Sequence, residues 1–470
     1  MTFPLRLDPD RLFPADGETA AVAQRLFAQV EHLPIVSPHG HTDPAWFALD
    51  APFEDATSLF LWPDHYVLRM LYSQGIGFEA LGVPHRGAEA KAERRAAWRL
   101  FAQNYHLFRG TPSRLWLDHA FAAVFGIGVR LGADTADLYY DMIGEALAKP
   151  EFRPRALFKR FNIEVLATTE GANDPLPHHR RIAAEWDGRV ISTFRPDAVV
   201  NPELAGFAHE VAELGRLTGE NTATWNGYLG ALRARRGHFR KAGRATASDH
   251  GHPTPFTADL APNECQGLLD RALKGSITAA EAELFRGQML TEMALMSCED
   301  SMVMQIHPGS HRNHNPGLFA AYGPDRGADI PMRVNYVDAL KPLLDKVGNR
   351  TDLTIILFTL DESNYARELA PLAGHYPCLT LGPPWWFHDS PEGMLRFRRN
   401  CTETAGFYNT AGFNDDTRAF LSIPARHDVA RRMDCAYLAE LVLTRRLEED
   451  EAAEVAVALA YGLPKKAYRL

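Results

Sequence analysis

The chain has 470 residues, of which 46% are hydrophobic and 23% charged, a composition ordinary for a globular protein with a large buried core. Its formal net charge of -9, without any block of lysines or arginines, argues against nucleic acid as a partner. No apolar run approaches the roughly 20 residues that a bilayer-spanning helix needs, and the first residues lack the apolar core of a signal peptide. We therefore expect a cytoplasmic protein without a membrane partner. Five scattered cysteines without a Cys-x-x-Cys pair predict reduced thiols.

The first predicted elements are a helix and a short strand. Residues 18–31 carry apolar side chains at helical spacing, and residues 34–37 form an apolar run typical of a strand. The motif Ser37-Pro38-His39-Gly40-His41 follows. On extended backbone, residues two apart point to the same side, so His39 and His41 would aim both imidazoles at one spot. The pair is either a set of metal ligands or, equally well from this motif alone, two loop histidines bonded to backbone.

Residues 42–160 form a long excursion in which apolar residues recur at threes and fours, as in helices. Helices are predicted over 91–104, 113–125 and 135–147. Gly126-Ile127-Gly128 does not follow a strand, so a dinucleotide site is not expected there. We divide the chain into an N-terminal helix and first strand (1–41), a helical insertion or lid (42–160), and the remaining barrel (161–470).

From residue 160 onward, short β-rich runs alternate with helical stretches. The runs are 163–168, 190–194, 245–248, 302–306, 353–359, 378–381 and 408–413, and the helices include 202–217, 278–296, 336–347 and 391–400. With 34–37 counted first, eight strands alternating with helices predict an α/β fold whose parallel sheet closes into a (β/α)8 barrel of the TIM type. An open, doubly wound sheet is the competing architecture.

The residues that follow the predicted strands support the barrel, because such barrels keep functional side chains at the carboxyl ends of their strands. Polar or aromatic residues stand there after most strands: His39 and His41, Thr168-Thr169-Glu170, Arg195-Pro196-Asp197, Asp249-His250-Gly251, His307, Trp385-Trp386-Phe387, and Asn414 to Arg418. Closure pairs the eighth strand with the first, so Asp416 would lie beside both histidines and complete a site for one divalent metal. The alternative role for Asp416 is an N-cap of the following helix.

With these features the sequence resembles the uronate isomerase (glucuronate isomerase) family of the amidohydrolase superfamily over nearly the whole chain. The motifs are Ser37-Pro38-His39-Gly40-His41, Asp64-His65-Tyr66-Val67-Leu68-Arg69, Thr193-Phe194-Arg195-Pro196-Asp197, His307-Pro308-Gly309-Ser310-His311-Arg312-Asn313, Trp385-Trp386-Phe387, and Asp416-Thr417-Arg418-Ala419-Phe420-Leu421-Ser422. The resemblance implies a metal-dependent hydrolase-like barrel. It also implies reversible aldose–ketose isomerisation of D-glucuronate to D-fructuronate, and of D-galacturonate to D-tagaturonate, through a cis-enediol.

One divalent ion is expected, because the predicted fourth strand lacks the lysine that bridges two metals in many superfamily members. Zinc is expected first, with manganese or iron as alternatives, and His39, His41 and Asp416 are the predicted ligands. Gly40 and Pro308 are unusual at their motif positions, which leaves the local backbone geometry open.

The implied reaction needs a base, an electrophile and a grip on the substrate carboxylate. Asp416 and Tyr66 are rival bases, and Arg418 could lower the pKa of the phenol or stabilise developing negative charge. His65 could orient the substrate or relay a proton, and Arg195 offers a guanidinium to the carboxylate. The further candidate substrate contacts are His307, which could also bind metal weakly, Arg312, Trp385 and Trp386.

Other charged runs are interpreted as solvated helix surface: His178-His179-Arg180-Arg181, and the group Arg426, Asp428, Arg431 and Arg432. Two other functions stay open, namely a mononuclear metal-dependent amidohydrolase or lactonase on the same barrel and a non-enzymatic metal- or sugar-binding protein. A homo-oligomer, dimer or trimer, is expected on base rates.

Overall fold

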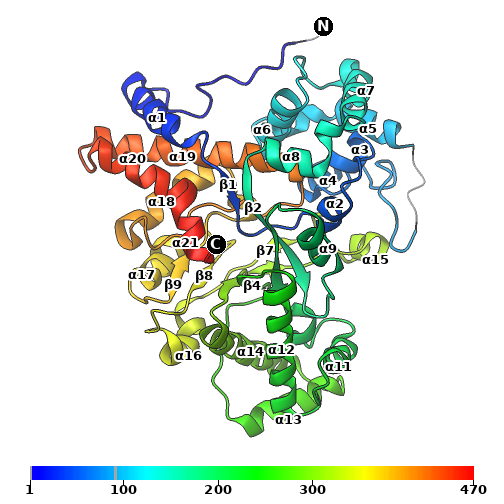
Figure 1. Cartoon of the computed structure of the whole chain (residues 1–470), viewed down its shortest axis with the longest axis vertical. Helices are drawn as coiled ribbons and strands as arrows, with labels where there is room; N and C mark the ends of the chain where they lie inside the picture. The colour runs from blue at the N-terminus through cyan, green and yellow to red at the C-terminus, as the bar shows by residue number, and fades with distance from the viewer. Residues whose placement is uncertain (1–2, 89–92) are drawn as a thin grey trace.

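The computed structural model describes residues 3–88 and 93–470. At its centre is a curled parallel sheet of seven strands, surrounded by helices (Figure 1). In order across the sheet these are β1 (Ile35–Ser37), β2 (Ile163–Gly171), β3 (Val190–Arg195), β4 (Ala247–His250), β5 (Val303–Ile306), β8 (Ile355–Leu357) and β9 (Leu379–Leu381). Two short antiparallel strands, β6 (Ser310–His311) and β7 (Ile330–Pro331), form a separate pair. The α/β class and the parallel sheet agree with the sequence prediction.

The eighth predicted strand, 408–413, does not form a continuous strand. Thr410 makes only an isolated parallel bridge to Leu381 of β9. Gly412 has a φ of 72°, in the left-handed region, and this interrupts the extended backbone that a ladder needs. Further along, the amide of His41 donates to the carbonyl of Thr417 at 3.0 Å. The chain thus passes between β9 and the end of β1 without adding a regular strand.

The helices between β1 and β2 pack together at one side of the sheet (Figure 1). They are α2 (Pro44–Leu49), α3 (Ala56–Phe60), α4 (His65–Ser73), α5 (Arg94–Gln103), α6 (Pro112–His119), α7 (Ala136–Leu147) and α8 (Pro154–Arg160). The helix expected from 91 begins at Arg94, and Lys91 lies outside the described residues. The helix expected over 113–125 changes to a π-helical turn at Ala120–Val124. Their core is continuous with Ile35 of β1 and Ile163 of β2, which fixes these helices on the sheet.

The other α-helices precede β1 or follow β2. They are α1 (Gly17–Val30), α9 (Pro177–Glu185), α10 (Asp197–Val200), α11 (Phe207–Thr218), α12 (Trp225–Ala242), α13 (Pro262–Leu273), α14 (Ala279–Asp300), α15 (Pro316–Tyr322), α16 (Val337–Val347), α17 (Ala370–Ala373), α18 (Pro391–Ala405), α19 (Ile423–Leu443), α20 (Glu449–Val457) and α21 (Leu463–Tyr468). The helix expected from 202 begins five residues later, because Gly206 at a φ of 86° turns the backbone first.

The last residues of the chain fill the interior of the curled sheet. Leu470 packs against Val36, Val165, Ala167 and Ile191 from β1 to β3, and Tyr468 packs against Ala247, Val303 and Ile356 from β4, β5 and β8. The carboxyl terminus accordingly lies against the central strands in Figure 1. Helix α21 therefore completes the core of the sheet.

Helix α19 is not the solvated surface that its charges suggested. Arg426, Arg431 and Arg432 are all buried, and α19 packs against α1 and α18. Arg431 donates to the carbonyls of Leu33 and Pro34 at 2.9 and 3.1 Å. The interpretation was wrong because a long guanidinium side chain can lie inside when carbonyls and carboxylates satisfy its donors. His179 of α9 is likewise buried.

Within the described residues, no helix is both long and apolar enough to cross a membrane. The five cysteines are free, as expected, and all except Cys298 are buried. Burial raises the pKa of the Cys378 and Cys401 thiols to about 12, so these side chains act as small apolar core residues.

Glu170 of β2 gives a prediction for stability. Burial raises the pKa of its carboxyl to about 7, although Ser192 donates a hydrogen bond to it. A pKa raised above the unfolded value means that protonation favours the fold, and this contribution is lost as pH rises through 7. Glu170→Gln should therefore stabilise the protein at pH 8 by roughly 1–3 kcal/mol and change little near pH 5, measured by urea unfolding.

Glu164→Gln on the same strand is the matched control. The Glu164 carboxylate accepts from Lys465 at 2.6 Å, so its replacement should give no stabilisation at pH 8. Equal unfolding midpoints for Glu170→Gln and the wild type at pH 8 would contradict the assignment of a buried carboxyl with a raised pKa.

Candidate active site

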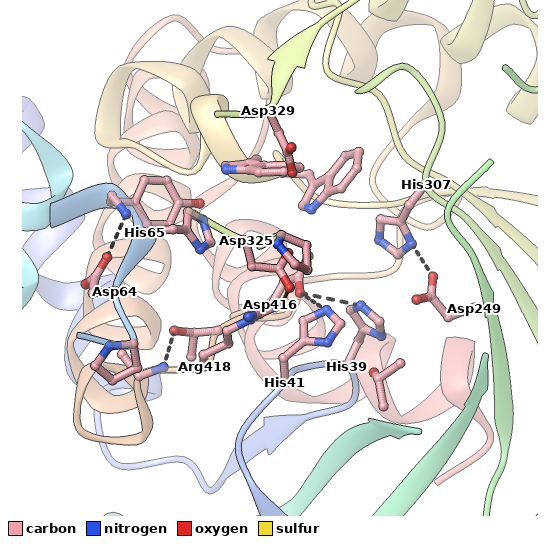
Figure 2. A pocket seen from close by; sticks show the side chains of 18 of the residues that line it. His39, His41, Asp64, His65, Asp249, His307, Asp325, Asp329, Asp416 and Arg418 are labelled. Atoms are coloured by element: carbon pink, nitrogen blue, oxygen red, sulfur yellow. Dashed lines mark hydrogen bonds and ion pairs between the residues drawn. The ribbon is translucent and has the colours of Figure 1, made fainter. Parts of the chain in front are cut away.

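A cavity of about 440 Å³ lies at the carboxyl ends of the strands. Four parts of the chain line it: the segments at the strand ends, the start of α4, the excursion that carries β6 and β7, and α19. The lining includes His39, His41, Asp64, His65, Tyr66, Thr169, Arg195, Asp249, His307, Arg312, Asp325, Asp329, Trp385, Trp386, Asp416, Arg418 and Arg426 (Figure 2). This is the end of a parallel α/β sheet at which functional side chains gather.

Asp416 faces two histidines, as Figure 2 shows. Its Oδ1 is 3.1 Å from Nε2 of His41 and 3.5 Å from Nε2 of His39. The structure therefore brings these three residues together, as barrel closure predicted, and Asp416 is not a helix cap. Its φ of 36° is left-handed, a strained conformation that aspartate tolerates better than most residues and that is often found at functional sites.

Asp416 stays ionised in this site. Burial opposes the charge, but the neighbouring His39 and His41 outweigh it and hold the pKa of Asp416 below its usual range. Burial also lowers the pKa of His39 to about 4, so its imidazole is neutral at physiological pH. Neutral imidazoles and an ionised carboxylate are the protonation states that metal ligands need.

These residues fit one divalent metal ion. Among the described residues, His39, His307 and Asp416 offer ligand atoms that all lie within 4.8 Å of one another. Nε2 of His307 is buried and has no hydrogen-bond partner among the residues that the structure describes, which leaves it available as a ligand. His41 is a predicted ligand that is not in this group of three. It contacts the group at Asp416, whose Oδ1 lies 3.1 Å from Nε2 of His41. Imidazole and carboxylate ligands suit zinc, manganese or iron.

Asp249, at the end of β4, is a site residue whose role the sequence did not show. Its Oδ1 accepts from Nδ1 of His307 at 2.6 Å, and its Oδ2 lies 3.1 Å from Nη1 of Arg195. Burial opposes its charge, but Arg195 and His307 hold the pKa of Asp249 well below its usual range. Because Nδ1 of His307 donates to Asp249, Nε2 is left as an acceptor on the cavity side. In the sequence, the position of Asp249 directly after the predicted fourth strand was the one indication that it belongs to the site.

Arg195 is held by two carboxylates rather than standing free. Its Nε donates to Oδ2 of Asp197 at 2.8 Å, and Nη1 faces Asp249. Gly251 passes so close that a Cβ there would lie 2.1 Å from Nη2. The guanidinium is thus fixed at the cavity wall, with part of its donor set left for a ligand.

His65 and Tyr66 reach the cavity from the first turn of α4. Asp64 caps this helix and accepts from the amide of Tyr66 at 2.9 Å. The two rings stack with centroids 4.5 Å apart, and burial raises the pKa of the Tyr66 phenol well above its usual value. The cation facing this phenol is Arg426, 5.7 Å from the ring centroid, rather than Arg418.

Two arginines at the cavity are paired with aspartates from the excursion between β6 and β7. Arg418 lies 2.9 Å from Asp325. Arg312 donates to Asp329 at 3.1 Å and lies over the Trp386 ring at 5.2 Å. Trp386 has a φ of 55°, unusual for a bulky residue. The excursion therefore fixes the position of predicted substrate contacts.

Arg426 is a second cavity residue that the sequence analysis missed. It is almost completely buried, its Nη1 contacts Asp389, and its guanidinium lies 3.5 Å from the centroid of the Trp116 ring. Burial raises the pKa of Asp389 to about 7, although Arg426 opposes this. No sequence motif marked it, because its partners come from α6 and from the segment before α18.

An α/β fold with a polar cavity at the carboxyl ends of its parallel strands, in which two histidines face an aspartate, is typical of enzymes. A family model described as glucuronate isomerase matches residues 17–467. The chain therefore belongs to the glucuronate isomerase family and is an enzyme of the isomerase class.

Relatives match over full length. The chain is 63% identical to the uronate isomerase of Phenylobacterium zucineum, covering 100% of this chain and 98% of the relative. It is 65% identical to that of Rhizorhabdus wittichii, covering 99% of each. Among solved structures, glucuronate isomerase from Caulobacter crescentus superposes with a TM-score of 0.98 at 59% identity, covering 99% of this chain and 98% of that one.

The buried role of Arg426 can be tested by replacing it. Arg426→Met keeps the length of the side chain but leaves Asp389 buried without its cation, so we expect a loss on the order of 3 kcal/mol in urea unfolding at pH 8. Arg399→Met is the control, because Arg399 forms an exposed pair with Glu440 and should cost less than about 1 kcal/mol. Equal losses for the two variants would contradict the assignment.

Proposed function

We propose that this enzyme interconverts aldose and ketose hexuronates, D-glucuronate with D-fructuronate and D-galacturonate with D-tagaturonate, through a cis-enediol. The observation that carries the proposal is the contact of one Asp416 oxygen with both His39 and His41, in a cavity that arginines also line. The full-length match to curated uronate isomerases supports it. No observation favours the hydrolase or the non-enzymatic binding protein.

His39, His41 and Asp416 would hold one divalent cation, with His307 as a further ligand or polar contact. When bound, the ion would supply Lewis-acid polarisation of substrate oxygens. Zinc is the ion we expect first, with manganese and iron as alternatives, since all three accept imidazole and carboxylate ligands.

The carboxylate of Asp416 is the base that we assign to proton transfer. It would take the proton from C2 of the aldose while O1 is protonated, which gives the cis-enediol; returning the proton to C1 while O2 loses its hydroxyl proton gives the ketose. Tyr66 is the weaker candidate, because burial raises the pKa of its phenol, whereas Asp416 remains ionised. The Tyr66 hydroxyl would instead donate a hydrogen bond to a substrate oxygen, and His65 beside it would help to orient the substrate.

Positive side chains would meet the negative charges of the substrate. Arg195 is the proposed partner of the substrate carboxylate, since its guanidinium is fixed at the cavity wall. Arg418 would stabilise the negative charge that develops on the enediol oxygens. Arg312, Trp385 and Trp386 would line the sugar-binding wall.

We further infer that residues 408–416 take the place of the eighth strand in a (β/α)8 barrel, which the bridge from Thr410 to Leu381 and the bond from His41 to Thr417 support. The insertion 42–160 would serve as a lid, since α4 supplies part of the cavity wall. A cytoplasmic homo-oligomer, dimer or trimer, remains our expectation.

Turnover can be tested directly. Purified protein with zinc, incubated with D-glucuronate in deuterated water, should give D-fructuronate signals in proton NMR. Asp416→Asn should lower the rate by at least about 100-fold, because it removes the base. Conversion at the wild-type rate by Asp416→Asn would contradict the assignment of the base, and no conversion of either uronate by the wild type would contradict the function.

The proposed ion pair between Arg195 and the substrate carboxylate gives a separate prediction. Gly251→Ala places a methyl group against Nη2 and should displace the guanidinium, so the KM for D-glucuronate should rise about tenfold, with a smaller change in kcat. Gly237→Ala in α12 is the control, because a Cβ at Gly237 would meet nothing within 4 Å. An unchanged KM in Gly251→Ala, or equal changes in both variants, would argue against Arg195 as the carboxylate partner.

A further inference from the structure

The carboxyl-terminal helix α21 is linked by hydrogen bonds to residues of the proposed metal site. Tyr468, the last residue of α21, is completely buried inside the curled sheet. Its hydroxyl donates to Oε1 of Gln305 at 2.9 Å and accepts from Nδ2 of Asn414 at 3.0 Å. Gln305 belongs to β5, and Asn414 lies two residues before Asp416. The Tyr468 hydroxyl thus connects α21 by hydrogen bonds to β5 and to the segment that contains Asp416.

Gln305 continues this connection to His39. Its side-chain nitrogen lies 3.3 Å from Nδ1 of His39, and Gln305 is completely buried. His39 uses its other nitrogen, Nε2, toward Asp416. The hydrogen bonds from Tyr468 to Gln305 and from Gln305 to His39 therefore end at Nδ1 of His39, the ring nitrogen that does not face Asp416.

In a metal-binding histidine, the hydrogen bond made by the ring nitrogen that faces away from the metal determines how well the other ring nitrogen binds it. A histidine that binds through Nε2 keeps its proton on Nδ1, and a fixed acceptor for that proton sets the tautomer and the ring orientation. The two ends of a carboxamide have the same shape, and a half-turn about its last bond exchanges nitrogen and oxygen. Metal binding through Nε2 of His39 calls for this turned orientation, in which the Gln305 oxygen accepts from Nδ1 and the Gln305 nitrogen donates to the Tyr468 hydroxyl. That hydroxyl then donates to the side-chain oxygen of Asn414, whose carboxamide turns over in the same way.

We propose that Tyr468 and Gln305 are positioning residues that fix the imidazole of His39 and thereby set the affinity of the site for its divalent cation. The inference rests on the metal site of the proposed function. Neither residue lines the cavity, so neither would touch the substrate. The carboxyl-terminal helix is in this way part of the support of the site as well as of the core.

The test measures zinc affinity of the full-length protein by competition with a chromophoric chelator, independently of turnover. Tyr468→Phe removes only the hydroxyl, and Gln305→Leu removes the acceptor for Nδ1. We expect each to weaken zinc binding by about tenfold or more, as for other partners of metal-binding histidines. Gln305→Glu should keep or tighten zinc binding, because a carboxylate accepts from both Tyr468 and His39.

Tyr228→Phe is the matched control, since it removes another buried hydroxyl, which donates to the carbonyl of Val199 at 2.6 Å away from the cavity. It should leave zinc affinity unchanged even if it lowers the melting temperature. Zinc affinities of Tyr468→Phe and Gln305→Leu within twofold of the wild type would overturn the proposal. So would a weakening that Tyr228→Phe or Gln305→Glu shares to the same extent, because that would indicate general loss of stability.

The result is separable from the test of the proposed function. If the wild type isomerises D-glucuronate and binds zinc but the variants bind it equally well, only the positioning role fails. If the wild type binds no zinc, the ligand set and this proposal fail together, whatever the outcome of the turnover measurement.

Discussion

The pairing of buried charge at the carboxyl ends of the strands is the constraint on which this structure depends. Asp416 and Asp249 are ionised inside the protein, where an unpaired carboxylate would be costly. Asp416 is accommodated by His39 and His41, and Asp249 by Arg195 and His307. Arg195 and His307 come from β3 and the end of β5, the strands that flank β4. His39 and His41 follow β1 and Asp416 follows β9, at opposite edges of the sheet, so the charge of Asp416 can be paired with them only when the sheet curls.

The same requirement explains the parts of the chain outside the sheet. The excursion around β6 and β7 supplies Asp325 and Asp329, which pair with the cavity residues Arg418 and Arg312. The segment before α18 supplies Asp389 for the buried Arg426. Elements that look like insertions along the chain therefore complete the ionic arrangement of the cavity, and this couples the active site to the stability of the fold.

Much of the fold could be predicted because local patterns carry it. Seven of the eight runs proposed as strands are strands, and the alternation with helices predicted the parallel sheet. The eighth run was less predictable, because Gly412 breaks its backbone while its apolar residues still resemble a strand. His39, His41 and Asp416 were predictable as neighbours, because motif spacing and the order of strands in a closed sheet both place them at one point.

The sequence by itself determined the class of fold, the family resemblance and the residues of the candidate metal site, since these depend on spacing along the chain and on residue type. Only the tertiary structure decided that Arg426 and Arg431 are buried, that Asp249 links Arg195 to His307, and that Tyr468 reaches His39 through Gln305. A periodic pattern reports which face a side chain occupies, but the partner that meets it there comes from a distant segment. Burial of a charged or polar group depends on that partner, and the folded chain alone supplies it.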